Sequence, residues 1–426
     1  MRLIIWALAA ITLFSNTVIA AEYKLLKPSF IVDVEKGTRS SGQSILIKDN
    51  MIVAISEETE ILNGHNIDPN NLNVIDLAGL TVFPGLIDAH SHILLHPYNE
   101  AEWNDQVIKE TRAERIARGV MHMKATLDAG FTSMRDLGTE GSEYDDVGLK
   151  IAMEKGVIVG PRLLVAGRAL VVTGSYGPKG LNQLHDITLG AEPADGDNVI
   201  KVVRDQIGKG ADVIKVYADY FWGPNGTPRP TFNQEELNLM VQTANDSGRN
   251  VVAHAVTNEG MRRATLAGVQ SIEHGDLGTE DTFKLMKDHG VIYCPTLSVN
   301  EANAEYAGWR KGVDENPCDV QIKYDSMKAA IKAGVTICNG SDVGPYTHGT
   351  NVRELKKLKE YGLEHLKTLQ AATMVGAELM NMKNKLGQLK VGFLADIIAV
   401  EGNPLEDLDV LGDVKMVMKN GEVHKR

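Results

Sequence analysis

Short apolar runs alternate with amphipathic stretches over most of the chain from residue 81 onward. The apolar runs have the length and residue types of buried strands, and stretches such as TNEGMRRATLAG and NVRELKKLKEYG follow them with a helical period. The eight predicted strands are TVFPGLIDAH, FTSMRDL, RLLVAG, DVIKVY, NVVAHA, SIEHG, VIYCPT and VTICNGSD. Eight such strand–helix units within residues 81–385 predict an α/β fold, a (β/α)8 barrel of the TIM type. An open doubly wound sheet is the alternative.

The two ends of the chain have a different pattern. Residues 21–80 contain short strands with turns, as in SILIKDNMIVAI, and residues 386–426 resemble them, with a hairpin-type Asn420-Gly421. Two β segments at opposite ends of a chain can pair with each other beside a central domain. We therefore expect a small β-sandwich domain built from both chain ends, next to the barrel.

Residues 1–20 have the pattern of a cleavable signal peptide. A basic residue, Arg2, precedes an apolar stretch, and small residues stand near the predicted cleavage point after Ala20. The apolar run is too short for a comfortable membrane span of about 20 residues. We expect a periplasmic or secreted protein that has no membrane anchor once the signal has been cleaved.

Composition and charge limit the classes of partner. The 426 residues are 43% hydrophobic and 23% charged, as in ordinary globular proteins, and the formal net charge is −12. A negatively charged chain without a basic stripe does not suit nucleic acid or an anionic membrane surface. We expect neither partner, and the composition leaves open whether the chain forms homo-oligomers.

Three cysteines are too few and too widely spaced for a disulfide framework. Cys294 and Cys338 stand in the apolar runs VIYCPT and VTICNGSD, so we expect both to be buried thiols. A pair that involves Cys318 stays open for a protein in an oxidising compartment.

Polar residues stand at the ends of several predicted strands, where barrel enzymes place their chemistry. The first strand ends at His90 and His92, which are two residues apart and therefore project from one face. The fifth strand ends at His254, the sixth at His274 and the eighth at Asp342. A single histidine in a strand is more often a hydrogen-bonded core residue, but packing alone does not account for this set. Imidazoles with a carboxylate are the ligands that a hydrolytic divalent metal site requires.

Lys215 lies inside the apolar run of the fourth strand. A buried ammonium is costly unless it is paired or neutralised. Carboxylation by CO2 would convert the amine into a carbamate that can bridge two cations, and pairing with a nearby acid such as Asp219 is the alternative. Tyr217 follows two residues later and faces the same interior. It is a candidate to contact a free carboxylate of the substrate, with ordinary barrel packing as the alternative.

Taken together, these motifs resemble the metal-dependent amidohydrolase superfamily. The resemblance is carried by the His-X-His of DAHSH, the lysine of IKVYAD, the histidines of VVAHA and IEHGD, and the aspartate of NGSDVG. The whole arrangement is similar to the imidazolonepropionase-like branch, which includes Xaa-Pro dipeptidases and ochratoxin-hydrolysing amidases. The resemblance covers essentially the whole mature chain, including the β segments at both ends.

The resemblance implies a pair of divalent metal ions, with zinc expected first. The ligands that it implies form two groups, His90, His92 and Asp342 for one ion and His254 and His274 for the other, with carboxylated Lys215 bridging. A hydroxide that bridges the metals would be the nucleophile, since metal coordination can lower the pKa of water from 15.7 to about 7. Asp342 would take the proton of the hydroxide and pass it to the leaving amine.

One motif departs from the pattern of this branch. Its members often have a Thr-Gly-Gly-His-Gly turn after the third strand, whose histidine polarises the scissile carbonyl. This chain has TGSYG, with Tyr176 in place of the histidine. A phenol can donate a hydrogen bond to a developing oxyanion. A loop tyrosine that packs over the barrel mouth is the alternative.

The leading functional hypothesis is an exported hydrolase that cleaves the amide bond of a dipeptide or an N-acyl amino acid. One alternative keeps the same site but opens a cyclic amide, as imidazolonepropionase does. Another is a non-catalytic metal-binding or scaffold protein that kept the fold. The last reading is disfavoured because no expected ligand is missing from the sequence.

Overall fold

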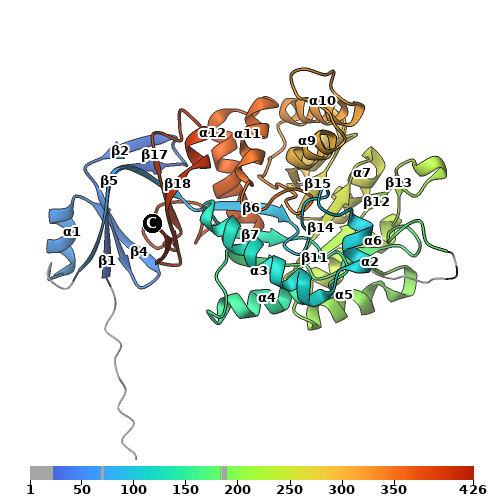
Figure 1. Ribbon diagram of the computed structural model, residues 1–426, viewed down its shortest axis with the longest axis horizontal. Coiled ribbons are helices and arrows are strands. Elements are labelled where there is room, and N and C mark those ends of the chain that lie inside the picture. Colours follow the sequence, from blue (N-terminus) through green and yellow to red (C-terminus); the bar gives the residue numbers. More distant parts are fainter. Residues whose placement is uncertain (1–22, 69–71, 183, 185–189) are drawn as a thin grey trace, which may run out of the picture.

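Strands from both ends of the chain form one sheet in the computed structural model, which describes residues 23–68, 72–182, 184 and 190–426. These strands are β1 (Tyr23–Asp33), β2 (Thr38–Ser41), β3 (Ser44–Lys48), β4 (Met51–Ser56), β5 (Asn73–Pro84), β17 (Ile397–Glu401), β18 (Val414–Lys419) and β19 (Glu422–Lys425). Their order is β19-β18-β17-β5-β1-β3-β4, with β2 paired to β1. Figure 1 shows the blue N-terminal and red C-terminal strands side by side at one end of the molecule. The β domain shared by the chain ends is therefore present, with its strands in a single sheet.

β5 joins the two halves of this sheet. It runs parallel to β1, with Val74 opposite Leu25, and antiparallel to β17, with Phe83 opposite Ile398. Apolar side chains from both chain ends pack together on this sheet, among them Leu26 and Met418. Helix α1 (Glu58–His65) also packs on the sheet. The predicted signal peptide, residues 1–20, lies outside the described residues.

The second part of the chain is the predicted barrel of parallel strands. Its strands are β6 (Leu86–Ser91), β7 (Phe131–Asp136), β8 (Arg162–Val165), β9 (Ala169–Val171), β11 (Val213–Tyr217), β14 (Asn250–Ala255), β15 (Ser271–His274) and β16 (Ile292–Cys294). β6, β7 and β8 pair in that order, as do β9, β11, β14, β15 and β16, while β10 (Ala191–Pro193) pairs with β9. β8 and β9 together form the third strand of the barrel. β9 pairs with β11, and the end of β8 also reaches that neighbour, since Asp212 N, just before β11, donates to Val165 O at 2.8 Å.

Helices surround these strands (Figure 1). They are α2 (Trp103–Lys109), α3 (Arg112–Asp128), α4 (Asp145–Glu154), α5 (Val199–Gly208), α6 (Gln234–Asn245), α7 (Asn258–Ala267), α8 (Glu280–Asp288), α9 (Leu297–Tyr306), α10 (Cys318–Ala333), α11 (Val352–Glu360), α12 (His365–Gln370) and α13 (Gly376–Leu379). The largest core cluster packs strand residues such as Ile214 and Ala253 against helix residues such as Leu237 and Met261. A short pair, β12 (Asp219–Tyr220) and β13 (Arg229–Pro230), follows β11. Within the described part of the chain, no helix is both long and apolar enough to cross a membrane.

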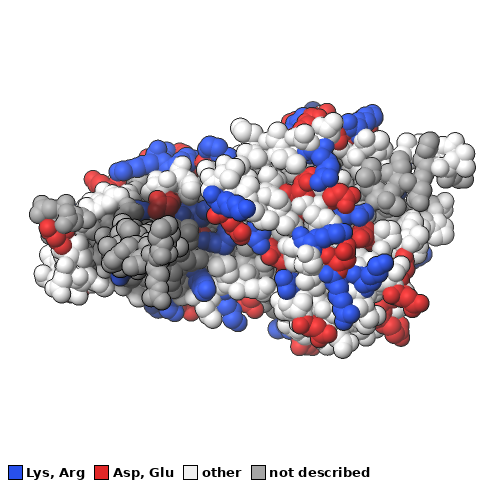
Figure 2. Space-filling view, turned by 90° about the horizontal axis from the view of Figure 1, so that it is seen from below, with Lys and Arg blue, Asp and Glu red and all other residues white. Residues whose placement is uncertain are grey.

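The surface carries both signs of charge. Figure 2 shows Lys and Arg side chains interspersed with Asp and Glu across the face seen from below. Many are paired along helices, as Arg262 and Arg263 are with Glu259 in α7. Such exposed pairs contribute little to stability, so the fold depends on its buried contacts.

The run predicted as the first barrel strand divides at Gly85. Residues 81–84 remain in β5 of the shared sheet, and β6 begins the barrel at Leu86. A Cβ at Gly85 would lie 2.2 Å from Thr132 Oγ1 on β7, so a larger residue would collide with the neighbouring strand. The sheet therefore passes directly into the barrel, and the first strand is shorter than the apolar run.

The predicted eighth strand is irregular, and only isolated bridges are found there. Cys338 N donates to Tyr293 O at 2.8 Å, and Asp342 N donates to His90 O at 2.8 Å. Residues 335–343 therefore lie between β16 and β6 and close the barrel, which excludes an open sheet. The ladder breaks because Asp342 has left-handed backbone geometry, with φ of 55°.

A buried carboxylate, Asp88, holds this irregular segment against β6. It accepts hydrogen bonds from Ser341 N at 2.9 Å, from the Ser341 hydroxyl, and from Asn351 Nδ2 at 2.6 Å. The amide of His90 donates to it at 3.3 Å. Burial raises the pKa of Asp88 to about 6, against the effect of these donors. The first strand and the eighth segment of the barrel thus donate hydrogen bonds to the same carboxylate, that of Asp88.

The expectation of two buried thiols is wrong for Cys294 and Cys338, which form a disulfide with a Cα separation of 4.9 Å. The two residues are 44 positions apart in the chain, which hides their proximity in the sequence. The barrel places β16 next to the irregular eighth segment and so brings them together. Cys318 is exposed and free.

We expect one reactive thiol in the denatured, unreduced protein and three after reduction, because Cys318 alone is free. Thiol titration in denaturant, followed by peptide mass mapping, measures both counts. The Cys318→Ser variant is the control and should give no thiol before reduction. Three thiols in the unreduced protein would contradict the disulfide.

Candidate metal centre

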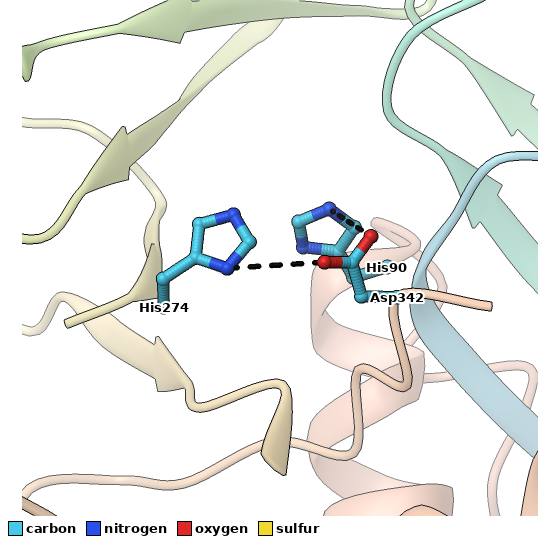
Figure 3. A group of neighbouring side chains, drawn as sticks. All are labelled: His90, His274 and Asp342. Atoms are coloured by element: carbon cyan, nitrogen blue, oxygen red, sulfur yellow. Dashed lines mark ion pairs between the residues drawn. The ribbon is translucent and has the colours of Figure 1, made fainter. Parts of the chain in front are cut away.

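The carboxyl ends of the barrel strands bring the predicted metal ligands to one place. The six residues are His90 and His92 at the end of β6, Lys215 on β11, His254 on β14, His274 on β15 and Asp342 in the eighth segment. Figure 3 shows three of them, His90, His274 and Asp342, whose ligand atoms lie within 4.8 Å of one another. Three such donors form a candidate metal site.

The Asp342 carboxylate lies among three of the imidazoles. Its Oδ1 is 3.3 Å from His92 Nε2 and 3.6 Å from His90 Nε2, and its Oδ2 is 3.9 Å from His274 Nδ1. Burial opposes ionisation, but His90 and His92 lower the pKa of Asp342 to about 2. Burial likewise favours neutral His92, but the bond to Asp342 raises the pKa of His92 to about 9. Carboxylate oxygens and imidazole nitrogens at these distances can serve as ligands of one cation.

Hydrogen bonds on the far side of the rings orient the imidazoles. His90 Nδ1 contacts Glu273 Oε2 at 2.8 Å, and Glu273 Oε1 in turn accepts from Arg135 Nη2 at 2.9 Å. His92 Nδ1 donates to Gly138 O at 2.9 Å. Partners of this kind fix the tautomer of a metal-binding histidine and turn its other nitrogen toward the metal.

Two imidazole nitrogens of the predicted ligands are left without a hydrogen-bond partner among the described residues. They are His90 Nε2 and His254 Nε2, and both are buried. The His254 ring is held by stacking on Tyr217, with centroids 4.5 Å apart. Buried polar atoms without partners are costly. Such nitrogens beside a carboxylate fit the donor set of a divalent cation.

His274 is held in a strained conformation. Its φ of 76° is left-handed, which is uncommon for a residue with a side chain. Two buried donors, the Tyr293 hydroxyl and Lys323 Nζ, each bond its carbonyl oxygen at 2.8 Å. Its Nδ1 lies 2.8 Å from Thr296 Oγ1. Strain of this kind persists only where the surroundings impose it, and it is concentrated at functional sites.

Lys215 is buried in the same interior, 1% exposed. Burial lowers its pKa to about 8, although the charges of Glu273 and Asp342 oppose the shift. Asp219, the alternative partner, instead accepts from Val256 N at 2.9 Å and Thr257 N at 2.7 Å. The carboxylate of Asp219 therefore holds the loop after β14 through hydrogen bonds to its main chain.

Tyr176 and Tyr217 lie next to each other at the site, with ring centroids 4.8 Å apart. The Tyr176 hydroxyl donates to Glu140 Oε2 at 2.5 Å. Burial raises the pKa of Tyr176 well above its ordinary value, and the charge of Glu140 adds to this effect. A phenol has a single proton, so this bond engages the donor that an oxyanion would need.

Several residues around the centre were not predicted from the sequence. Arg135 and Glu273 carry a detectable signal, because each is an ionisable residue inside an apolar strand, as Lys215 is. Glu140 and Thr296 lie in loops and carry no such signal. Their roles depend on contacts between distant segments.

A closed barrel of parallel strands, with histidines and a carboxylate at the carboxyl ends of the strands, is the arrangement found in barrel hydrolases that bind metal ions at that end. The profile of the Amidohydrolase family matches residues 81–424. The chain belongs to the amidohydrolase family, as its motifs predicted.

Its relatives include an ochratoxinase, a Xaa-Pro dipeptidase and a prolidase. Ochratoxinase from Aspergillus niger is 32% identical over 412 residues, which cover 90% of this chain and 82% of the relative. A Xaa-Pro dipeptidase structure with bound methionine has a TM-score of 0.82 at 32% identity and covers 95% of this chain and 100% of its own. A prolidase structure in complex with N-methylphosphonate-L-proline has a TM-score of 0.80 at 30% identity, with the same coverage.

Thr296→Val should lower the affinity for a divalent cation by about tenfold or more, because it removes the hydrogen bond to His274 Nδ1 and preserves side-chain shape. Competition with a chromophoric chelator measures the affinity.

Thr265→Val on α7 is the matched control, since Thr265 Oγ1 is buried without a partner in the described part of the chain. Equal affinities in the two variants would show that Thr296 does not orient His274.

Proposed function

We propose that this amidohydrolase is a binuclear metal-dependent enzyme that cleaves the amide bond of dipeptides or N-acyl amino acids. The observation that carries the proposal is the convergence of four imidazoles, a lysine and a carboxylate, with two imidazole nitrogens lacking partners among the described residues. The related structures that hold methionine and N-methylphosphonate-L-proline support a small amino-acid ligand. The likeness to ochratoxinase extends the proposed class to ochratoxin-type amides.

We assign the six residues to two cations. One would be held by His90, His92 and Asp342, and the other by His254 and His274, with carboxylated Lys215 between them. The lowered pKa of Lys215 favours its free amine, which can add to the carbon of CO2 and lose a proton to form the carbamate. Two divalent ions, zinc in this proposal, would polarise the scissile carbonyl and lower the pKa of water.

The residues of the chain then move the proton and hold the substrate. Asp342 begins ionised, so it can accept a proton during attack and deliver it to the leaving amine. Glu273 and Thr296 keep His90 and His274 in position through their hydrogen bonds. Tyr217, stacked on His254, is placed to contact the substrate.

We expect metal-loaded protein to release amino acids from a panel of Xaa-Pro, Xaa-Phe and Xaa-Lys dipeptides and N-acyl amino acids. Lys215→Ala should lower the initial rate by more than about 100-fold, because several kcal/mol of metal-supplied stabilisation is lost. Its metal content should fall below two ions per chain.

Lys209→Ala, which removes an exposed lysine at the end of α5, is the control and should match the wild type. If protein that holds two metal ions cleaves no substrate of the panel, the proposal that it hydrolyses these amides is wrong. Turnover of cyclic amides instead would show that the enzyme opens a ring, the alternative reaction for this site. Metal retention without turnover of either class would indicate a binding protein.

We propose that the protein is exported by its first 20 residues. The Cys294–Cys338 disulfide supports an oxidising compartment. Protein recovered from the periplasm or medium should begin at Ala21, as N-terminal sequencing would determine. Full-length protein confined to the cytoplasm would contradict export.

A further inference from the structure

A buried carboxylate outside the ligand set, Glu140, lies beside the candidate metal centre. It follows β7 in left-handed geometry, with φ of 49°, and is 2% exposed. Its Oε2 accepts hydrogen bonds from Trp103 Nε1 at 2.9 Å and from the Tyr176 hydroxyl at 2.5 Å. Its Oε1 is buried and has no hydrogen-bond partner among residues that the structure describes.

The free oxygen of Glu140 borders one of the proposed metal ligands. A Cβ built on Gly138 would lie 3.2 Å from Glu140 Oε1 and 3.7 Å from His92 Cε1. The carboxylate oxygen and the imidazole therefore meet at the same small space. A side chain at position 138 would fill it.

The charge of Glu140 is not matched by its hydrogen-bond donors, since Trp103 and Tyr176 are both neutral. The guanidinium of Arg115 is nearby, but its Nη1 donates to the main-chain carbonyl of Glu140 at 2.8 Å. That bond fixes the loop and does not reach the free oxygen. A buried anion with one unused oxygen is costly unless a ligand completes it.

Aromatic rings cluster around Tyr176, the phenol that donates to this carboxylate. Tyr176 lies 5.2 Å from Trp103, 4.8 Å from Tyr217 and 4.9 Å from Tyr220, measured between ring centroids. The faces of such rings attract cations. Lys179 Nζ already lies 5.5 Å from the centroid of Tyr220, so one ammonium is accommodated at the edge of the cluster.

We propose that Glu140 and these aromatic rings recognise a positively charged nitrogen of the amide substrate, either the α-ammonium of a dipeptide or the basic end of a side chain. This inference rests on the proposed amide hydrolysis and narrows its substrate class. The cationic nitrogen donates to Glu140 Oε1 and lies against the aromatic faces. A neutral N-acyl amino acid leaves the carboxylate unpaired and binds less well.

Glu140→Gln tests this recognition, because the amide keeps an acceptor for Trp103 or Tyr176 and removes the charge. The substrates are Ala-Xaa, N-acetyl-Ala-Xaa and N-acetyl-Lys-Xaa, where Xaa is the C-terminal residue that is cleaved fastest in the panel, or Pro if none is cleaved. kcat/KM and calorimetric Kd are measured for each with metal-loaded mature protein. Glu143→Gln, a change of one charge in the same loop at a partly exposed residue, is the control.

We expect the wild type to prefer a cationic substrate, and Glu140→Gln to lower kcat/KM for that substrate by about 10- to 100-fold while the neutral one changes little. Preference for Ala-Xaa identifies the α-ammonium, and preference for N-acetyl-Lys-Xaa identifies the side chain. An equal loss for all three substrates makes Glu140 a structural brace and overturns the proposal.

Binding separates this proposal from the proposed function. If the wild type cleaves no substrate but binds the cationic one more tightly, and Glu140→Gln abolishes that difference, hydrolysis fails and cation recognition stands. If the Kd values do not depend on the substrate charge, cation recognition fails whatever the turnover.

Discussion

The carboxylate of Asp88 closes the barrel where the strand ladder is broken. It accepts hydrogen bonds from Ser341, Asn351 and the amide of His90, so a buried charge takes the place of regular strand pairing. These donors offset the cost of burying the carboxylate. Asp342 stands one residue beyond Ser341, and His90 two residues beyond Asp88. The same contacts that close the barrel therefore place the first and last candidate ligands opposite each other.

Strain and charge are concentrated around this closure. His274, Thr296, Asp342 and Glu140 all have left-handed backbone geometry at the mouth of the barrel. Each is held by partners from other segments, as His274 is by Tyr293 and Lys323. The free energy of burying and straining these groups is offset by the packed helices and strands around them. These contacts within the protein hold the backbone of the site in place.

The fold and the clustering of the candidate ligands could be predicted because their signals are local. Apolar runs mark the strands, and His90, His254 and His274 stand at strand ends, where a parallel barrel gathers side chains. The division at Gly85, the irregular eighth strand and the Cys294–Cys338 disulfide could not be predicted in this way. Each depends on a contact between distant segments, such as the approach of Thr132 to Gly85.

The sheet shared by both chain ends has a consequence for the order in which the protein can form during synthesis. β5 cannot gain its second neighbour until β17 (Ile397–Glu401) has left the ribosome. Asp342 is likewise made long after His90, so the barrel cannot close from its N-terminal half alone. Contacts between such distant segments form slowly. The growing chain keeps its candidate ligands apart for most of its synthesis, and they can meet only when nearly all of the protein is present.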